Sequence, residues 1–300
     1  MPGRLLDPKL LAATRGLTLA ARGLVSGLLP GLHASRRPGL AREFAQYRAY
    51  QPGDEPRHID WKLFARSDRY FVRESESETA VNMRLILDAT ASMQHADVAN
   101  PALTKFDFAR TLAAAFALLA AAQGDQVGLH AVSGDGVVSV PPGQHRQPTE
   151  RILHTLANLR AAGPWPAEAR RALAGTLGAQ TNRREIVVVL TDGHEQDDEI
   201  RGALAPWRVR GHELLLCQIV GRDEEDFPFQ GLVRFEDWET GATQETDADA
   251  ARAAWVAGYH QRLEAWRREW TGSGRFDALR FLLDELPGNV LRTYLKRRQR

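Results

Sequence analysis

Two stretches decide the fold of this 300-residue chain: "MRLILDATAS" (residues 83–92) and "REIVVVLTDG" (residues 184–193). Each is rich in long or branched apolar residues without helical spacing, which predicts a buried strand that ends in small polar residues. From about residue 80 such strands alternate with helical stretches. This alternation predicts an α/β fold, with a doubly wound, mostly parallel sheet of the Rossmann type and helices on both faces.

The polar residues at the two strand ends are the candidate site. Asp88, Thr90 and Ser92 follow the first strand, and Asp192 follows the second. Because ligands bind outside the carboxyl ends of strands in an open parallel sheet, we expect these four side chains to lie together. Carboxylate and hydroxyl oxygens are ligands that suit a hard divalent cation. The sequence therefore predicts a Mg2+ site formed by these residues.

The composition is that of an ordinary globular protein, with 43% hydrophobic and 26% charged residues. A formal net charge of +1 argues against a dedicated nucleic-acid binder, which shows a clear basic excess. The single cysteine, Cys217, excludes an intrachain disulfide and a cysteine-based zinc site. It stands in an apolar run, so we interpret it as a small buried hydrophobic residue.

We expect four parts along the chain. They are an N-terminal amphipathic helix (1–30), a small extended or β annex (31–78), the α/β domain (79–245) and a C-terminal helical segment that packs on the core (246–300). The first helix ends at a proline–glycine pair. In the last part, an aromatic and apolar stripe at helical spacing indicates core packing rather than a ligand site.

The N-terminal helix carries an apolar face formed by Leu6, Leu10, Ala13, Leu17, Leu24 and Leu28. We expect this face to pack on its own domain or on a partner, with peripheral contact to a membrane surface as the alternative. No integral membrane segment is expected, because no run approaches the roughly 18 apolar residues that a span needs. A cytoplasmic location follows as an expectation.

The spacing of Asp88, Thr90 and Ser92 resembles the first element of the metal-ion-dependent adhesion site in von Willebrand factor A domains, usually Asp-x-Ser-x-Ser. The run Thr191-Asp192-Gly193 resembles its last element. The resemblance implies that the hydroxyls contact a metal directly and the aspartates directly or through water. An acidic residue of the partner then completes the coordination shell.

One ligand of that family site has no counterpart here. The family supplies a further threonine from a loop before a helix, and Trp165 or Pro166 stands at the corresponding place. Two interpretations follow. Either the site binds Mg2+ weakly with water in the gap, or it is degenerate and its side chains hydrogen-bond the loop and cap the following structure.

Upstream, residues 31–78 carry a long irregular pattern that resembles the signature of a bacterial domain of unknown function, number fifty-eight. The matching positions are Glu43-Phe44, Arg48, Tyr50, Pro52-Gly53-Asp54, Arg57, Ile59-Asp60-Trp61-Lys62 and Ala65-Arg66. The resemblance continues to the end of the chain. Departures include Pro38, which splits an Arg-Gly pair, and Glu55, where a second aspartate is common.

This resemblance implies a non-enzymatic protein with a von Willebrand factor A-like domain, which acts with a MoxR-type AAA+ ATPase in chaperone-like maturation or assembly of client proteins. The signature segment is interpreted as a structural annex, with an ATPase docking surface as the alternative. Two other functions stay open. They are a Mg2+-dependent hydrolase or phosphotransferase, although no phosphate loop or nucleophile elbow is present, and a nucleic-acid-associated protein that uses the tail 296–300.

Overall fold

The computed structural model describes residues 8–26, 44–51, 59–75, 82–143, 146–178, 185–194, 198–209, 212–271, 276–285 and 287–298. The chain divides into two compact units. The larger unit comprises Met1–Leu28 and Val81–Arg300, and the smaller one is Leu29–Ala80. The first helix therefore belongs to the same unit as the α/β core.

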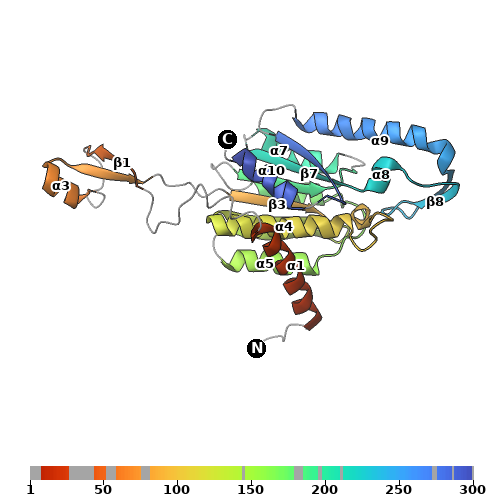
Figure 1. Ribbon diagram of the computed structural model, residues 1–300, viewed down its shortest axis with the longest axis horizontal. Helices are drawn as coiled ribbons and strands as arrows, with labels where there is room; N and C mark the ends of the chain where they lie inside the picture. The colour runs from red at the N-terminus through yellow and green to blue at the C-terminus, as the bar shows by residue number, and fades with distance from the viewer. Residues whose placement is uncertain are drawn as a thin grey trace. The chain divides into compact units, whose positions relative to one another are not determined.

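A six-stranded sheet forms the centre of the larger unit, in the order β10-β7-β6-β3-β4-β5 (Figure 1). All neighbouring strands are parallel except β4 and β5, which are antiparallel. The bounds are β3 Asn82–Asp88, β4 Gln126–Ser133, β5 Gly136–Gly143, β6 Glu185–Thr191, β7 Glu213–Val220 and β10 Phe276–Leu282. The α/β fold class and the mostly parallel sheet are confirmed.

Helices cover the sheet on both faces (Figure 1). On one face α4 packs against β3 and β4, and α1 and α5 pack against α4. On the other face, residues of α6, α7 and the end of α9 share a hydrophobic cluster with Ile86, Val187 and Leu216. The bounds are α1 Pro8–Ser26, α4 Lys105–Gln123, α5 Arg146–Asn158, α6 Ala169–Gly178, α7 Glu199–Val209, α8 Arg222–Asp226, α9 Ala248–Thr271 and α10 Gly288–Arg298.

The chain order of the strands places a switch point between β3 and β6. From β3 the chain runs to β4 and β5 on one side and then crosses to β6 on the other side of β3. Loops that leave the ends of two such strands diverge to opposite faces and leave a crevice between them. Asp88 is the last residue of β3, and Asp192 follows β6 directly. The fold thus brings the two predicted strand ends to the position where ligands bind.

Helix α4 is the central helix of this core. It buries twelve residues, among them Phe108, Leu112 and Phe116. It is also the one helix among the described residues that is long and apolar enough to meet the length and composition criterion for a membrane span, which the sequence analysis did not detect. A buried core helix passes the same test, and α4 lies in contact with four strands of the sheet (β3, β4, β6 and β7) and with α1 and α5.

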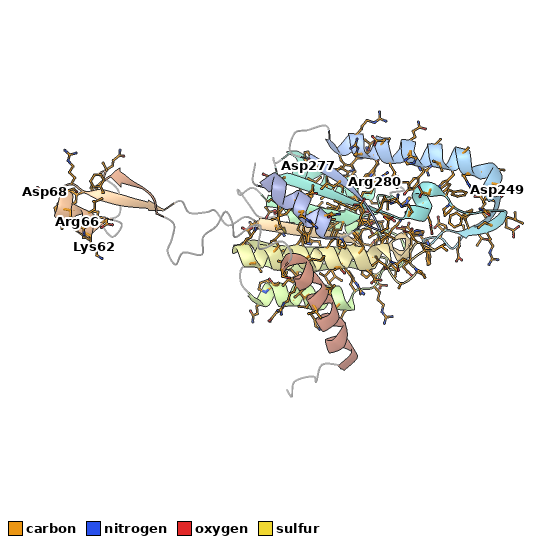
Figure 2. The ribbon with its side chains drawn as sticks, in the orientation of Figure 1. Lys62, Arg66, Asp68, Asp249, Asp277 and Arg280 are labelled. Carbon is orange, nitrogen blue, oxygen red and sulfur yellow. The ribbon has the colours of Figure 1, made fainter. Side chains whose placement is uncertain are left out.

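The C-terminal part requires a correction. Residues 246–300 were expected to be a helical segment, and α9 and α10 are helices, but Phe276–Leu282 is the edge strand β10, paired in parallel with β7. Its apolar residues recur at a spacing that also suits a helix, and the hydrogen bonds offered by the free edge of β7 decide for the strand. Figure 2 shows Asp277 and Arg280 on this edge, where charges discourage pairing with another chain. Arg280 also pairs with Glu225 of α8 at 2.6 Å.

The smaller unit contains the antiparallel strands β1 (Phe44–Ala49) and β2 (Phe71–Ser75) and the helix α3 (Trp61–Ser67). Asp60 caps α3, because its Oδ1 accepts hydrogen bonds from the backbone N–H groups of the second and third helical residues. Figure 2 shows Lys62 and Arg66 on this helix. The signature positions 52–58 and Glu43 lie outside the described residues, as do the side chains of Arg48 and of the tail 296–300. The proposed roles of these positions stay predictions.

Candidate functional site

The end of β3 forms a tight hydrogen-bonded cluster of buried polar groups. Asp88 Oδ1 accepts from the backbone N–H of Thr90 at 3.0 Å and from its hydroxyl at 2.8 Å. Asp88 Oδ2 accepts from the hydroxyl of Thr191, at the end of β6, at 2.7 Å. The hydroxyls of Thr90 and Ser92 lie 3.1 Å apart. The structure therefore brings the three predicted residues of the first element together and adds Thr191.

The loop expected to hold the missing threonine does lie beside this cluster. The backbone N–H of Ala162 donates to Ala89 O at 2.9 Å, and that of Ala91 donates to Gly163 O at 2.8 Å. Gly163 has a φ of +60°, and a Cβ on it would lie 2.9 Å from the Cα of Gly134, in the turn between β4 and β5. The close approach of this loop to that turn therefore needs glycine at position 163. The side chain of Trp165 packs against the hydrophobic core cluster, and it has no oxygen that could act as a metal ligand.

Asp192 faces a buried lysine. Lys105, the first residue of α4, places its Nζ 3.3 Å from Asp192 Oδ2 and 2.6 Å from Glu224 Oε1. The side chains of Lys105 and Asp192 are 1% and 0% exposed. The second oxygen of each carboxylate accepts a backbone hydrogen bond. Asp192 Oδ1 accepts from the N–H of His194 at 3.1 Å, and Glu224 Oε2 accepts from the N–H of Gly221 at 2.8 Å. Two carboxylates, one from the loop after β6 and one from helix α8, thus share one internal ammonium group.

Burial and neighbouring charges shift the pKa values of these groups. Burial, followed by the negative charge of Asp192, raises the pKa of Asp88 to about 7, against the hydrogen bonds from Thr191 and Thr90. Burial disfavours the charged form of Lys105, but Glu224 and Asp192 outweigh this effect and raise its pKa above the ordinary value. Burial disfavours the charged form of Glu224 too, but the charge of Lys105 together with the hydrogen bond and charge of His194 outweighs this effect and lowers the pKa well below its usual range. The Lys105–Glu224 pair is therefore ionised at neutral pH.

Two features of the described residues count against a complete metal-ion-dependent adhesion site. Asp192, the predicted ligand from β6, already has a cation beside it, and the neighbouring loop supplies no side-chain oxygen at 161–166. The Mg2+ assigned to Asp88, Thr90, Ser92 and Asp192 stays a prediction, with Lys105 as the observation against it.

Lys105 was not among the site residues expected from the sequence. The structure starts α4 at Lys105 with Thr104 as the cap, whose hydroxyl accepts from the N–H of Asp107 at 2.9 Å. A signal was present, since Thr-x-x-Asp is the spacing of a helix start. Lysine at the first position of a helix also opposes the helix dipole, which marks it as a residue that needs nearby carboxylates.

An aromatic cavity of about 750 Å³ has Glu224, the ion-pair partner of Lys105, in its lining. It lies among α8, the start of α9 and the hairpin of β8 (Leu232–Glu236) and β9 (Thr243–Asp247). Its lining combines aromatic side chains with carboxylates: Phe227, Phe229, Phe235, Trp238 and Trp255, with Asp223, Glu224, Glu236 and Asp237. His95 and Glu224 connect the cavity with the charged cluster, since His95 O accepts from the backbone N–H of Lys105 at 2.9 Å. The sequence analysis did not identify this cavity.

The topology and the paired strand ends define a von Willebrand factor A-like α/β protein. The chain belongs to the family described as "Protein of unknown function DUF58", whose model matches residues 46–265. The uncharacterized proteins Rv1480 of Mycobacterium tuberculosis and Mb1516 of Mycobacterium bovis are each 31% identical over 248 residues, 82% of this chain and 76% of theirs. The family membership inferred from the signature segment is confirmed.

Solved structures similar to this chain include von Willebrand factor A domains. The conserved hypothetical protein BatB from Bacteroides thetaiotaomicron is 15% identical, with a TM-score of 0.47 over 73% of this chain and 98% of that one. The SpRpn10 VWA domain is 11% identical, with a TM-score of 0.43 over 72% and 95%. A von Willebrand factor type A protein from Catenulispora acidiphila is 12% identical, with a TM-score of 0.38 over 75% and 42%.

Proposed function

We propose that this chain is a non-enzymatic protein-binding module of the cytoplasm, which acts with a MoxR-type AAA+ ATPase in the maturation or assembly of client proteins. The partner contacts the carboxyl end of the sheet, where the strand-end cluster and the aromatic cavity adjoin. The family resemblance supports the ATPase as partner. The structure supports the place of contact.

The exposed aromatic side chains of the cavity carry this proposal. Trp238 is 55% exposed and Trp255 is 40% exposed, and both line the cavity. A group of large apolar side chains that is exposed together and rimmed by charges is typical of a protein interaction site. Tryptophan at such a site often contributes a large share of the binding energy. The carboxylates of Glu236 and Asp237 on the same lining favour a partner segment with basic side chains.

The buried cluster offers little support for catalysis. Asp88 is hydrogen-bonded to both threonines, and Asp192 and Glu224 are paired with Lys105, so the described groups hold one another in place. A rigid polar cluster of this kind positions the loops that border the cavity. The runner-up function, a Mg2+-dependent hydrolase or phosphotransferase, predicts Mg2+-dependent turnover of phosphate esters by the purified chain.

A pull-down with a purified MoxR-type ATPase tests the proposal. We expect the wild-type chain to retain the ATPase and Trp238→Ala to weaken binding at least tenfold, because a buried interface tryptophan contributes about 2 kcal/mol or more. Val138→Ala is the matched control, since Val138 is an exposed apolar residue on β5, at the far edge of the sheet from the cavity. Equal retention of wild type and Trp238→Ala, or no retention of the ATPase, would contradict the proposal.

The nucleic-acid alternative predicts a different result. A chain that binds DNA through its basic tail shows an affinity that falls linearly with salt on a logarithmic scale. If the chain does not bind single-stranded or duplex DNA at low salt, this alternative is excluded. If it binds DNA in a salt-dependent way and does not retain the ATPase, the nucleic-acid function replaces the proposed one.

A further inference from the structure

We propose that the ammonium group of Lys105 is the resident cation at the strand ends and takes the place of the divalent metal that such a site holds elsewhere. The partner-binding face at the carboxyl end of the sheet would then be formed without Mg2+. The inference concerns the same face as the proposed function but does not depend on which partner binds there.

The position of Lys105 is the first argument. Its Nζ lies between the loop that follows β6 and the start of α8, 3.3 Å from Asp192 Oδ2 and 2.6 Å from Glu224 Oε1. A Mg2+ ion bound to Asp192 needs its oxygen at about 2.1 Å in octahedral geometry. Two cations cannot share that carboxylate without strong repulsion at this depth of burial. A directly coordinated metal and the lysine are therefore mutually exclusive on Asp192.

The second argument is that the lysine is held there against its local preferences. It is the first residue of α4, where the helix dipole disfavours a cation, and it is 1% exposed. A buried ammonium at such a position is stable only with carboxylates close by, and Asp192 and Glu224 supply them. Lysine also suits this role as a compact point charge, unlike the broad planar arginine that dominates the basic residues of this chain.

The third argument is the donor set that remains. With Asp192 engaged, the cluster at the end of β3 offers Asp88, Thr90 and Ser92, whose oxygens are hydrogen-bonded to one another and to Thr191. The adjacent loop joins this cluster through backbone groups alone, at Ala162 and Gly163. The internal lysine and these hydrogen bonds together complete the polar interactions of both strand ends.

The test is Mn2+ binding to the full chain, measured by the loss of the electron paramagnetic resonance signal of free Mn2+. We expect the wild-type chain to leave the signal unchanged up to about 1 mM Mn2+, near the weak limit of protein sites for hard divalent cations. Lys105→Met keeps the length of the side chain and removes the charge, so it should bind Mn2+ at least tenfold more tightly. Lys62→Met, on the exposed α3 helix, is the matched control and should behave as wild type.

Two further measurements keep the test decisive. If Lys105→Met alone does not fold, the double variant Lys105→Met/Glu224→Gln removes one of the two uncompensated carboxylates and is titrated in its place. In either background Asp192→Asn should abolish the gained binding. Sub-millimolar Mn2+ binding by the wild-type chain overturns the proposal, and so does a folded Lys105 variant that gains no Mn2+ affinity.

Discussion

Acid should destabilise this protein through one buried histidine. A row of polar side chains crosses four adjacent strands: Glu185 of β6, Arg84 of β3, His130 of β4 and Ser139 of β5. Arg84 donates to Glu185 Oε1 at 3.3 Å and lies 3.4 Å from Nε2 of His130, whose Nδ1 is 2.9 Å from the hydroxyl of Ser139. Because arginine has only donors, Nε2 must accept, and the proton of the neutral imidazole is on Nδ1.

The sign and size of the pH effect follow from this environment. Burial, followed by the charge of Arg84, lowers the pKa of His130 from 6.5 to about 4. Between these pH values His130 takes up a proton in the unfolded chain but not in the folded chain, so its contribution to the free energy of unfolding falls as the pH drops through 6.5. The loss is about 2 kcal/mol at pH 5 and approaches about 3 kcal/mol below pH 4. Above pH 6.5 His130 adds no pH dependence to the stability.

Urea denaturation at pH 8 and pH 5, followed by tryptophan fluorescence, measures this effect. We expect the stability of His130→Gln to fall less than that of wild type between the two pH values, by about 2 kcal/mol, because glutamine does not titrate. His154→Gln, at an exposed position on α5, is the matched control and should follow the wild-type curve. Equal pH dependence of wild type and His130→Gln would show that His130 is not held neutral by burial beside Arg84.

Three further predictions concern packing and caps. Gly163→Ala should destabilise the larger unit by about 1 kcal/mol or more beyond Gly124→Ala in denaturant titrations. Both glycines have a positive φ, but only a Cβ at position 163 would lie within 2.9 Å of backbone, at Gly134 Cα. Equal losses of stability in the two variants would therefore refute a steric clash at position 163. Leu112→Ala, at 0% exposure in α4, should lower stability by about 2 to 5 kcal/mol, and a smaller loss would contradict its core position. Asp60→Ala should speed amide exchange in α3, with a loss of about 1 kcal/mol of local stability; unchanged exchange would exclude the cap.

Much of the fold could be predicted from local sequence. The apolar runs that became β3, β6 and β7 were recognisable because a buried parallel strand needs apolar residues on both faces. The helical stripe expected in the part 246–300 lies in α9, and its periodicity made it recognisable. The strand β10 was not predicted because its apolar residues have a spacing that suits a helix as well as an edge strand. Only the hydrogen bonds with β7 decide for the strand.

The candidate site was predicted in part. The cluster of Asp88, Thr90 and Ser92 was expected because the carboxyl ends of parallel strands meet at one edge of the sheet. Lys105 was not expected there, since no local pattern shows that the first residue of a helix will point at a carboxylate 87 residues away in sequence. The aromatic cavity also joins residues from α8, α9 and a hairpin, which only the folded chain brings together.

The sequence by itself determined the family, the α/β class and the strand ends at which a site would form, because these depend on periodicity and on short motifs. Only the tertiary structure decided what stands at those ends. Charge pairing in a buried site depends on distances between segments far apart in the chain, and these distances put the ammonium of Lys105 between Asp192 and Glu224.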